Sequence, residues 1–152
     1  MSVADELEYV KKYLRLEQAR FGERLQVRWE LDPGVLDTEL PVLSVQPLVE
    51  NAVRHGLERR GGRGTVEIRA REAGADVELQ VIDDGMGMNP ARARAVLEGR
   101  LPAQGGIGLS NVQARLQATY GPEYGLRIQS QVGRGTTATI TLPRRTAEVR
   151  AA

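Results

Sequence analysis

Two runs of alternating side chains around one glycine limit the possible folds of this chain more than any other feature. Residues 65–71 and residues 76–83 both place apolar side chains at every second position, and Gly74 lies between them. These apolar positions are Val66, Ile68, Ala70, Val77, Leu79 and Val81. A period of two is typical of a strand with one buried face, and a glycine between two such strands is typical of a tight turn. The pattern predicts an antiparallel hairpin whose apolar face must be covered.

The other elements follow from similar patterns. Helices are predicted over residues 3–21, 90–98 and 108–120, and strands over residues 25–31, 126–132 and 136–142. A further helix ends near Gly56. It begins either near Val45 with Ser44 as its cap, or at Pro41 with a kink, and the sequence allows both. Adjacent strands joined by tight turns predict an α/β (α+β) two-layer sandwich, in which helices cover one face of a mixed, largely antiparallel sheet.

Composition excludes several classes of function. The chain has 152 residues, which fits one domain, and a formal net charge of +1. With 4% aromatic residues and no excess of basic charge, neither nucleic acid nor a membrane surface is expected as a partner. The absence of cysteine excludes disulfides and thiolate metal sites and suits a reducing compartment, so a cytoplasmic location is expected.

The helix that ends near Gly56 carries an unusual polar face. Glu50, Asn51, Arg54 and His55 recur at the spacing of three and four residues that places side chains on one side of a helix. Carboxylate, carboxamide, guanidinium and imidazole groups can together hold a metal ion and the phosphates of a nucleotide. A solvated helix face fits this segment equally well.

Two glycine-rich motifs follow. Residues 83–88, Asp-Asp-Gly-Met-Gly-Met, come directly after a predicted strand, where the Asp83 carboxylate can accept a hydrogen bond deep in a pocket. The glycines would let the backbone approach a flat ligand, although a simple Asp-Gly turn is the alternative. Residues 105–110, Gly-Gly-Ile-Gly-Leu-Ser, precede a predicted helix, where free N–H groups favour phosphate.

Together these motifs resemble those of the ATP-binding superfamily of gyrase, Hsp90, histidine kinases and MutL. The matching motifs are Glu50-Asn51, Asp83-x-Gly85-x-Gly87, Gly106-x-Gly108-Leu109 and Gly133-x-Gly135-Thr136. Within the superfamily the chain resembles the LytS-type sensor histidine kinases. They carry Gln-Pro-Leu-Val-Glu-Asn-Ala-x-x-His-Gly, as residues 46–56 do, and Tyr-Leu-x-x-Glu-x-x-Arg-Phe, as residues 13–21 do. The resemblance covers about residues 5–143.

This resemblance implies a Bergerat ATP-binding fold that binds ATP with Mg²⁺. Asn51 would coordinate the metal, and Glu50 would support the metal or accept a proton. Arg54 and His55 would contact phosphates or ribose. Asp83 would bind the adenine amino group, with Thr136 acting through water. The remaining ATP-binding residues implied are Gly85, Gly87, Met88, Gly106, Ile107, Gly108 and Leu109.

Three hydrophobic side chains, Met86, Met88 and Ile107, are candidate walls for the purine, with ordinary packing as the alternative. Residues 89–105 would form a lid that closes over the triphosphate.

The single histidine of the chain implies where the phosphoryl group goes. His55 lies in the nucleotide-binding helix and not in an acceptor motif, so the resemblance implies an acceptor outside this chain. Residues 1–22 would be the C-terminal part of a helical dimerisation and acceptor hairpin without its acceptor histidine. Residues 23–143 would be the catalytic domain, and residues 144–152 a frayed tail.

The implied partners are ATP or ADP, the acceptor-histidine helical domain of the same kinase and a response regulator. A dimer would form only where the hairpin is complete, and the full-length parent would be membrane-anchored.

Pro47 separates kinase from ATPase. ATPases and anti-sigma-factor kinases of the superfamily carry a glutamate four residues before the metal-binding asparagine, where it orients the nucleophile. Here that position is Pro47, which has no side-chain base. We therefore expect a protein-histidine kinase catalytic domain that hydrolyses ATP weakly or not at all and does not phosphorylate itself. The alternatives are an anti-sigma-factor-type serine kinase and a degenerate scaffold; the intact asparagine, aspartate and glycines count against the scaffold.

Overall fold

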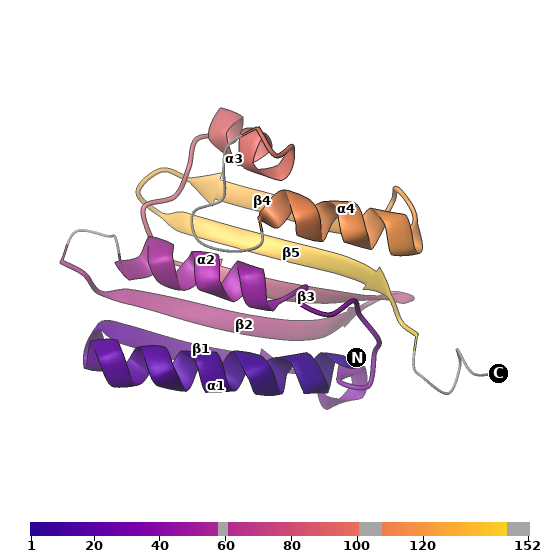
Figure 1. Cartoon of the computed structure of the whole chain (residues 1–152), viewed down its shortest axis with the longest axis horizontal. Coiled ribbons are helices and arrows are strands. Elements are labelled where there is room, and N and C mark those ends of the chain that lie inside the picture. Colours follow the sequence, from indigo (N-terminus) through magenta and orange to yellow (C-terminus); the bar gives the residue numbers. More distant parts are fainter. Residues whose placement is uncertain (58–60, 101–107, 146–152) are drawn as a thin grey trace.

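One five-stranded sheet, with the strand order β1-β2-β3-β5-β4, organises the molecule (Figure 1). The computed structural model describes residues 1–57, 61–100 and 108–145. The strands are β1 (Leu25–Leu31), β2 (Gly64–Ala73), β3 (Asp76–Asp83), β4 (Gly125–Gln131) and β5 (Gly135–Pro143). Only the β1–β2 pair among them is parallel, and the other three pairs are antiparallel. The prediction of a mixed, largely antiparallel sheet is confirmed.

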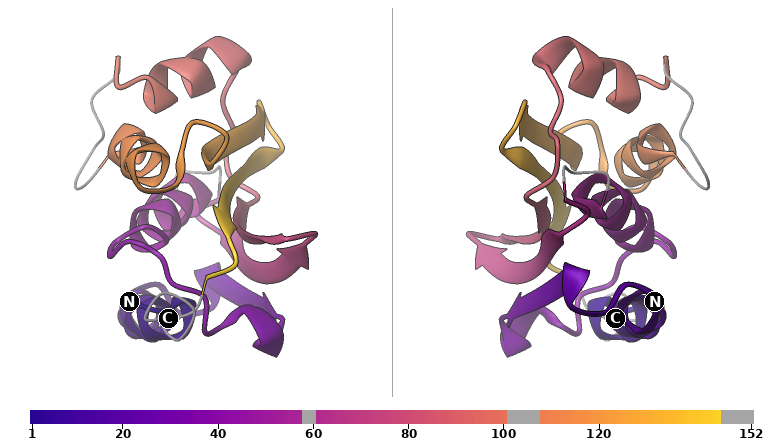
Figure 2. Two further views of the ribbon diagram at one scale, coloured as in Figure 1. Left: turned by 90° about the vertical axis from the view of Figure 1, so that its right-hand side faces the viewer. Right: turned by 90° about the vertical axis from the view of Figure 1, so that its left-hand side faces the viewer.

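Helices cover one face of this sheet. They are α1 (Val3–Phe21), α2 (Gln46–Leu57), α3 (Pro90–Leu97) and α4 (Leu109–Tyr120). Figure 2 shows α1, α2 and α4 in one layer beside the sheet, whereas α3 lies at the edge, in contact with β4 and α4. The predicted two-layer sandwich is confirmed. Among the described residues, no helix is long and apolar enough to cross a membrane.

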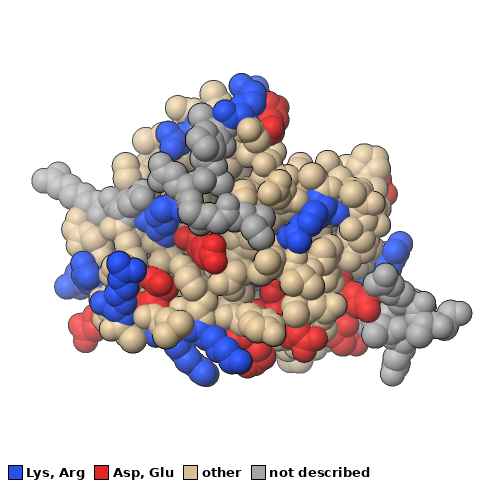
Figure 3. Space-filling model, in the orientation of Figure 1, with Lys and Arg blue, Asp and Glu red and all other residues tan. Residues whose placement is uncertain are grey.

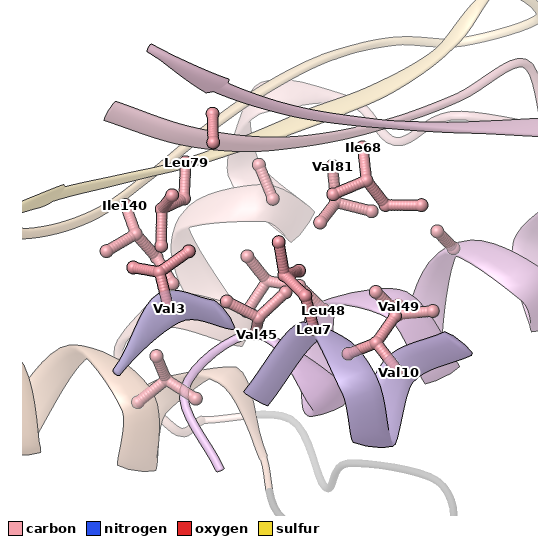
Figure 4. Packing of buried hydrophobic residues seen from close by; sticks show 14 of the residues in the cluster. Val3, Leu7, Val10, Val45, Leu48, Val49, Ile68, Leu79, Val81 and Ile140 are labelled. Carbon is pink, nitrogen blue, oxygen red and sulfur yellow. The ribbon is translucent and has the colours of Figure 1, made fainter. Parts of the chain in front are cut away.

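The core lies between these two layers. Val3, Leu7 and Val10 of α1 point toward the sheet together with apolar side chains from the start of α2, and Ile68, Leu79, Val81 and Ile140 come from the strands (Figure 4). The opposite face of the sheet is polar and carries ion pairs such as Arg71–Glu78 at 3.1 Å. Acidic and basic side chains are interspersed on the side of the molecule seen in Figure 3, so no large patch of one sign forms there.

The start of α2 agrees with the predicted start near Val45, but the predicted cap is wrong. The helix begins at Gln46, so Pro41 lies outside it and Pro47 is its second residue. The Ser44 hydroxyl donates to the Pro41 carbonyl at 2.6 Å and therefore does not cap α2. The carboxylate of Glu6 in α1 instead binds the N–H groups of Ser44 and Val45, just before α2, and of Gln46, its first residue. Sequence periodicity could not reveal this cap because the two partners are about 40 residues apart.

The beginning of the C-terminal segment is held by hydrogen bonds. Arg144 binds Glu72 and donates to the Gly34 carbonyl at 2.6 Å, and the Arg145 carbonyl accepts the N–H of Glu39 at 2.7 Å. These two residues belong to the range for which fraying was expected. Residues 146–152 of that range lie outside the described residues.

Candidate functional site

The C-terminal end of β3 places a buried carboxylate next to a buried imidazole nitrogen. Asp83 is 5% exposed, and its Oδ1 accepts the Gly85 N–H at 2.9 Å. Its Oδ2 lies 3.8 Å from Nδ1 of His55, which is longer than a hydrogen bond. His55 Nδ1 is buried and has no hydrogen-bond partner among the described residues. A polar group inserted here would therefore meet hydrogen-bonding capacity that the protein itself does not use.

Thr136 lies directly across the sheet from Asp83, because the two residues are partners in the β3–β5 register. The Thr136 hydroxyl is 2.8 Å from the hydroxyl of Ser130, and the Ser130 hydroxyl accepts the Met88 N–H at 2.7 Å. Ser130 thus ties Thr136 to the glycine motif that follows β3. Sequence reasoning missed Ser130. Its signal is a small polar residue at the inward position of β4 that follows the apolar Leu126 and Ile128.

The polar face of α2 combines an internal hydrogen bond with a groove. Arg54 donates through Nη2 to Oδ1 of Asn51 at 2.6 Å, which holds the carboxamide next to a guanidinium. Glu50 accepts from Nε2 of Gln46 at 3.3 Å and, like Arg54, lines a groove between α1 and α2. This groove has a volume of about 470 Å³. Its lining residues are Tyr13, Glu17, Arg20, Phe21, Glu50, Val53, Arg54 and Leu57.

Tyr13 reports the electrostatics of this α1–α2 groove. The pKa of the Tyr13 phenol is raised to about 12. Burial is the main cause, and the nearby carboxylates of Glu17 and Glu50 contribute to the same rise. The phenol is therefore neutral and able to donate a hydrogen bond at any physiological pH. The groove combines this donor with carboxylates and guanidinium groups directly beside the Asn51–Arg54 pair.

Two glycines after β3 are required by the packing of the chain itself. A Cβ at Gly85 would lie 2.5 Å from the carbonyl oxygen of His55, so only glycine lets β3 end against the last turn of α2. Gly87 has a φ of +70°, and a Cβ there would lie 2.0 Å from the carbonyl oxygen of Gln131. The space that a side chain would need at Gly85 or Gly87 is therefore occupied by protein backbone and is not available to a ligand.

The two predicted methionine walls have different environments. Met86 is 55% exposed, whereas Met88 is buried beside Ser130. Met88, Asp83 and Thr136 line an open cavity of about 680 Å³ next to the start of α3. The predicted purine wall at Ile107 and the ATP-binding residue Gly106 lie outside the described residues, as do residues 101–105 of the predicted lid.

The start of α4 offers backbone N–H donors within the second glycine-rich motif, residues 105–110. Gly108 is the N-cap of α4 and has no side chain to bind the first N–H groups, and Leu109 is the first helical residue. Among the described residues no cluster of three or more His, Cys, Asp or Glu could hold a metal ion.

Comparison with protein families places most of the chain in one of them. The family described as "Histidine kinase-, DNA gyrase B-, and HSP90-like ATPase" matches residues 37–146.

Curated relatives include several sensor histidine kinases. The chain is 36% identical over 143 residues to the sensor histidine kinase YesM of Bacillus subtilis, which covers 94% of this chain and 24% of YesM. It is 33% identical over 145 residues to the sensor protein LytS of Bacillus anthracis, with 94% of this chain and 25% of LytS covered. The chain thus spans about a quarter of the length of these relatives.

Solved structures share the fold. The catalytic domain of the histidine kinase ThkA superposes with a TM-score of 0.73 at 14% identity, covering 95% of this chain and 93% of that one. The mycobacterial sensor histidine kinase MprB gives a TM-score of 0.66 at 20% identity, covering 92% of this chain and 95% of that one.

Proposed function

Because this chain belongs to the family of histidine kinase-, DNA gyrase B- and HSP90-like ATPases, we propose that it is the ATP-binding catalytic domain of a sensor histidine kinase. In this proposal it transfers the γ-phosphoryl group of ATP to a histidine outside the chain, and the phosphoryl group is then transferred to a response regulator. The observation that carries the proposal is the buried Nδ1 of His55, which has no hydrogen-bond partner among the described residues and lies next to the buried carboxylate of Asp83 and the Asn51–Arg54 pair. Since the chain spans about a quarter of its curated relatives, the activity and partners of the whole protein belong to this proposal.

Asp83 would bind the base of the nucleotide. A carboxylate whose Oδ1 is already held by Gly85 keeps Oδ2 free to accept from an exocyclic amino group, the donor that adenine presents. Thr136, fixed by Ser130, would add a hydroxyl through a bridging water. Burial of Asp83 makes the interaction selective, since a ligand without the donor would leave the carboxylate unsatisfied.

Asn51, Arg54 and the start of α4 would bind the triphosphate. The Arg54 guanidinium donates to Oδ1 of Asn51 in this structure. It would be a suitable phosphate ligand when Oδ1 of Asn51 binds a metal ion instead. Gly108 and Leu109 would supply backbone N–H groups at the positive end of α4. When bound, Mg²⁺ would neutralise phosphate charge. Because it takes most of its ligands from phosphates and water, the single oxygen of Asn51 suffices.

Pro47 and Glu50 favour phosphoryl transfer over hydrolysis. Pro47 is buried in the first turn of α2 and supplies no base for an attacking water or serine. This counts against the anti-sigma-factor-type serine kinase. Glu50 lies in the α1–α2 groove, where it could accept the proton of an incoming imidazole. A neutral imidazole already has a nucleophilic nitrogen and needs less activation than a serine.

The acceptor of this reaction would belong to a separate helical domain. His55, the only histidine of the chain, has a side chain that is 20% exposed and faces Asp83. This position suits a nucleotide contact and not a phosphoacceptor. A membrane anchor, a dimer and a response regulator would be properties of the full-length kinase.

Titration calorimetry of the isolated chain tests this function. Wild type should bind Mg-ATP and Mg-ADP, and Asp83→Asn should lose at least tenfold in affinity, because a carboxamide donor can then face the adenine donor. Asp84→Asn is the matched control. Asp84 accepts the Thr65 N–H at 2.8 Å, a bond that asparagine can keep, so affinity should remain near wild type.

Two results would overturn the proposal: absence of binding heat for wild type at high protein concentration, or equal affinities for the two variants. A radiolabelled γ-phosphate should in addition move to a separately supplied acceptor-histidine domain and not to water.

A further inference from the structure

The first turn of α2 is capped by a buried carboxylate from another helix. Glu6 of α1 is 1% exposed and accepts the N–H groups of Ser44 and Gln46, both at 3.1 Å, as well as that of Val45. These are donors that the start of a helix leaves without partners, and Pro47, the next residue, has no N–H. A negative charge at a helix N-terminus is also favourable. Glu6 therefore accepts every backbone N–H from Ser44 to Gln46, the residues directly before Pro47.

A second helix holds the same segment from the other side. Arg115 of α4 donates to the carbonyl oxygens of Val42 and Leu43 at 2.6 and 2.5 Å. Leu43 has a φ of +61°, a conformation that is unfavourable for leucine and that is kept only when surrounding contacts impose it. Residues 42–46, which we call the α2 lead-in, are thus fixed by α1 through Glu6 and by α4 through Arg115.

The α2 lead-in connects directly to the candidate site. Asn51 lies five residues after Gln46 in the same rigid helix, which is about 7.5 Å along its axis. A shift of the first turn therefore moves Asn51 and Arg54 with it. The other helix that holds the lead-in, α4, begins at Gly108 and Leu109. The lead-in thus belongs to one of the two helices proposed to bind phosphate, and it is hydrogen-bonded to the other through Arg115.

We propose that Glu6 is a positioning residue for the nucleotide site and that it couples the docking of α1 to nucleotide affinity. This inference rests on the proposed function. Apolar contacts alone would hold α1 in place, since Val3, Leu7 and Val10 already pack against the core (Figure 4). A buried carboxylate is not the residue that maximises stability in such a place. Glu6 instead fixes the positions of three N–H groups at the start of α2, the helix that carries Asn51.

Coupling of this kind must act in both directions. If α1 docked through Glu6 raises the affinity for nucleotide, then bound nucleotide must strengthen the bonds between Glu6 and the lead-in by the same factor. The amides of Ser44, Val45 and Gln46 would then exchange with solvent more slowly when Mg-ADP is bound. They lie away from the Asp83 end of the site, so direct shielding does not explain such slowing.

Mg-ADP titration of three proteins tests the proposal. Glu6→Gln keeps the size of the side chain but turns one acceptor into a donor that faces backbone N–H groups. It should weaken Mg-ADP binding by roughly fivefold or more, the usual lower range for coupled sites. Glu8→Gln is the matched control, because Glu8 lies on the same helix and contacts only Lys11 at the surface among the described residues. It should bind like wild type.

Hydrogen exchange of wild type gives a second readout that needs no variant. Mg-ADP should slow the amides of residues 44–46 more than it slows those of residues 70–79, the turn end of the β2–β3 hairpin, which lies away from Asp83 and reports the general effect of a bound ligand. Equal slowing, or a Glu6→Gln protein that is folded and binds like Glu8→Gln, would overturn the inference while leaving the proposed function intact. Should Glu6→Gln fail to fold, the exchange result decides. If wild type binds no Mg-ADP at all, the proposed function fails and this inference falls with it.

Discussion

Asp83 Oδ2 lies 3.8 Å from His55 Nδ1, and this contact joins the end of β3 to the last turn of α2. The two atoms are too far apart for a hydrogen bond, and Nδ1 of His55 is buried without a hydrogen-bond partner among the described residues. Such unused capacity is rare inside proteins and marks a place where a ligand can supply the missing partner. The relationship also explains why one glycine is needed nearby, since Gly85 passes against the His55 carbonyl.

Replacing His55 should weaken nucleotide binding without unfolding the chain. His55→Phe keeps a ring of similar shape but removes both nitrogens, so a ligand loses one hydrogen-bond partner. We expect about a tenfold loss of affinity for Mg-ATP, which corresponds to about 1.4 kcal/mol. His55→Gln, which restores a polar group, should recover part of it. Calorimetric affinities of the two variants that equal wild type would show that His55 does not contact the nucleotide.

Replacing Gly87 should destabilise the fold through two separate effects. Alanine at this φ of +70° costs about 1 kcal/mol, and its Cβ would also collide with the Gln131 carbonyl. We expect Gly87→Ala to lower the free energy of unfolding by about 2 kcal/mol or more, measured by urea denaturation.

Gly74→Ala separates the two effects. Gly74 has a similar φ of +64°, but a Cβ there would meet nothing within 4 Å. Only the conformational cost of about 1 kcal/mol should remain. Equal losses in the two variants would mean that the backbone around Gln131 yields to the added methyl group.

The raised pKa of Tyr13 predicts how stability changes at alkaline pH. The pKa of the Tyr13 phenol is about 12 in the folded state, whereas the ordinary pKa of tyrosine is 10.0. The stabilisation from Tyr13 is therefore complete below pH 10 and is lost as pH rises from 10 toward about 12. Tyr13→Phe cannot lose this proton, so its free energy of unfolding should fall less steeply than that of wild type across this range.

Urea midpoints measured at several pH values check the prediction. Tyr9→Phe is the control, since Tyr9 is 59% exposed on the same helix. It should follow the wild-type curve. Parallel curves for wild type and Tyr13→Phe would show that the Tyr13 phenol ionises alike in the folded and unfolded chains.

Patterns local in the sequence were sufficient to predict the elements. The alternation in residues 65–71 and 76–83 predicted the β2–β3 hairpin, and α1 begins and ends as predicted at Val3 and Phe21. These predictions succeed because the period of apolar residues directly reflects which side of a strand or helix is buried. Motif resemblance likewise led to the family, and the comparisons confirm it.

Contacts between distant residues were decided only by the tertiary structure. The spacing of polar residues on α2 predicted one polar face, but not what that face contacts. Glu50 and Arg54 both line the groove against α1, and Arg54 also binds Asn51. Spacing along a helix gives the angle between side chains and says nothing about what surrounds them.

By itself the sequence determined the strands, the helices, the fold class and the family, because each of these depends on local periodicity or on short motifs. The tertiary structure alone decided that Glu6 caps α2, that Ser130 ties Thr136 to Met88, and that the glycine at 87 makes room for backbone. Each of these arrangements includes at least one partner far away in the chain. A buried hydrogen bond or a steric contact of that kind leaves no period in the sequence from which it could be read.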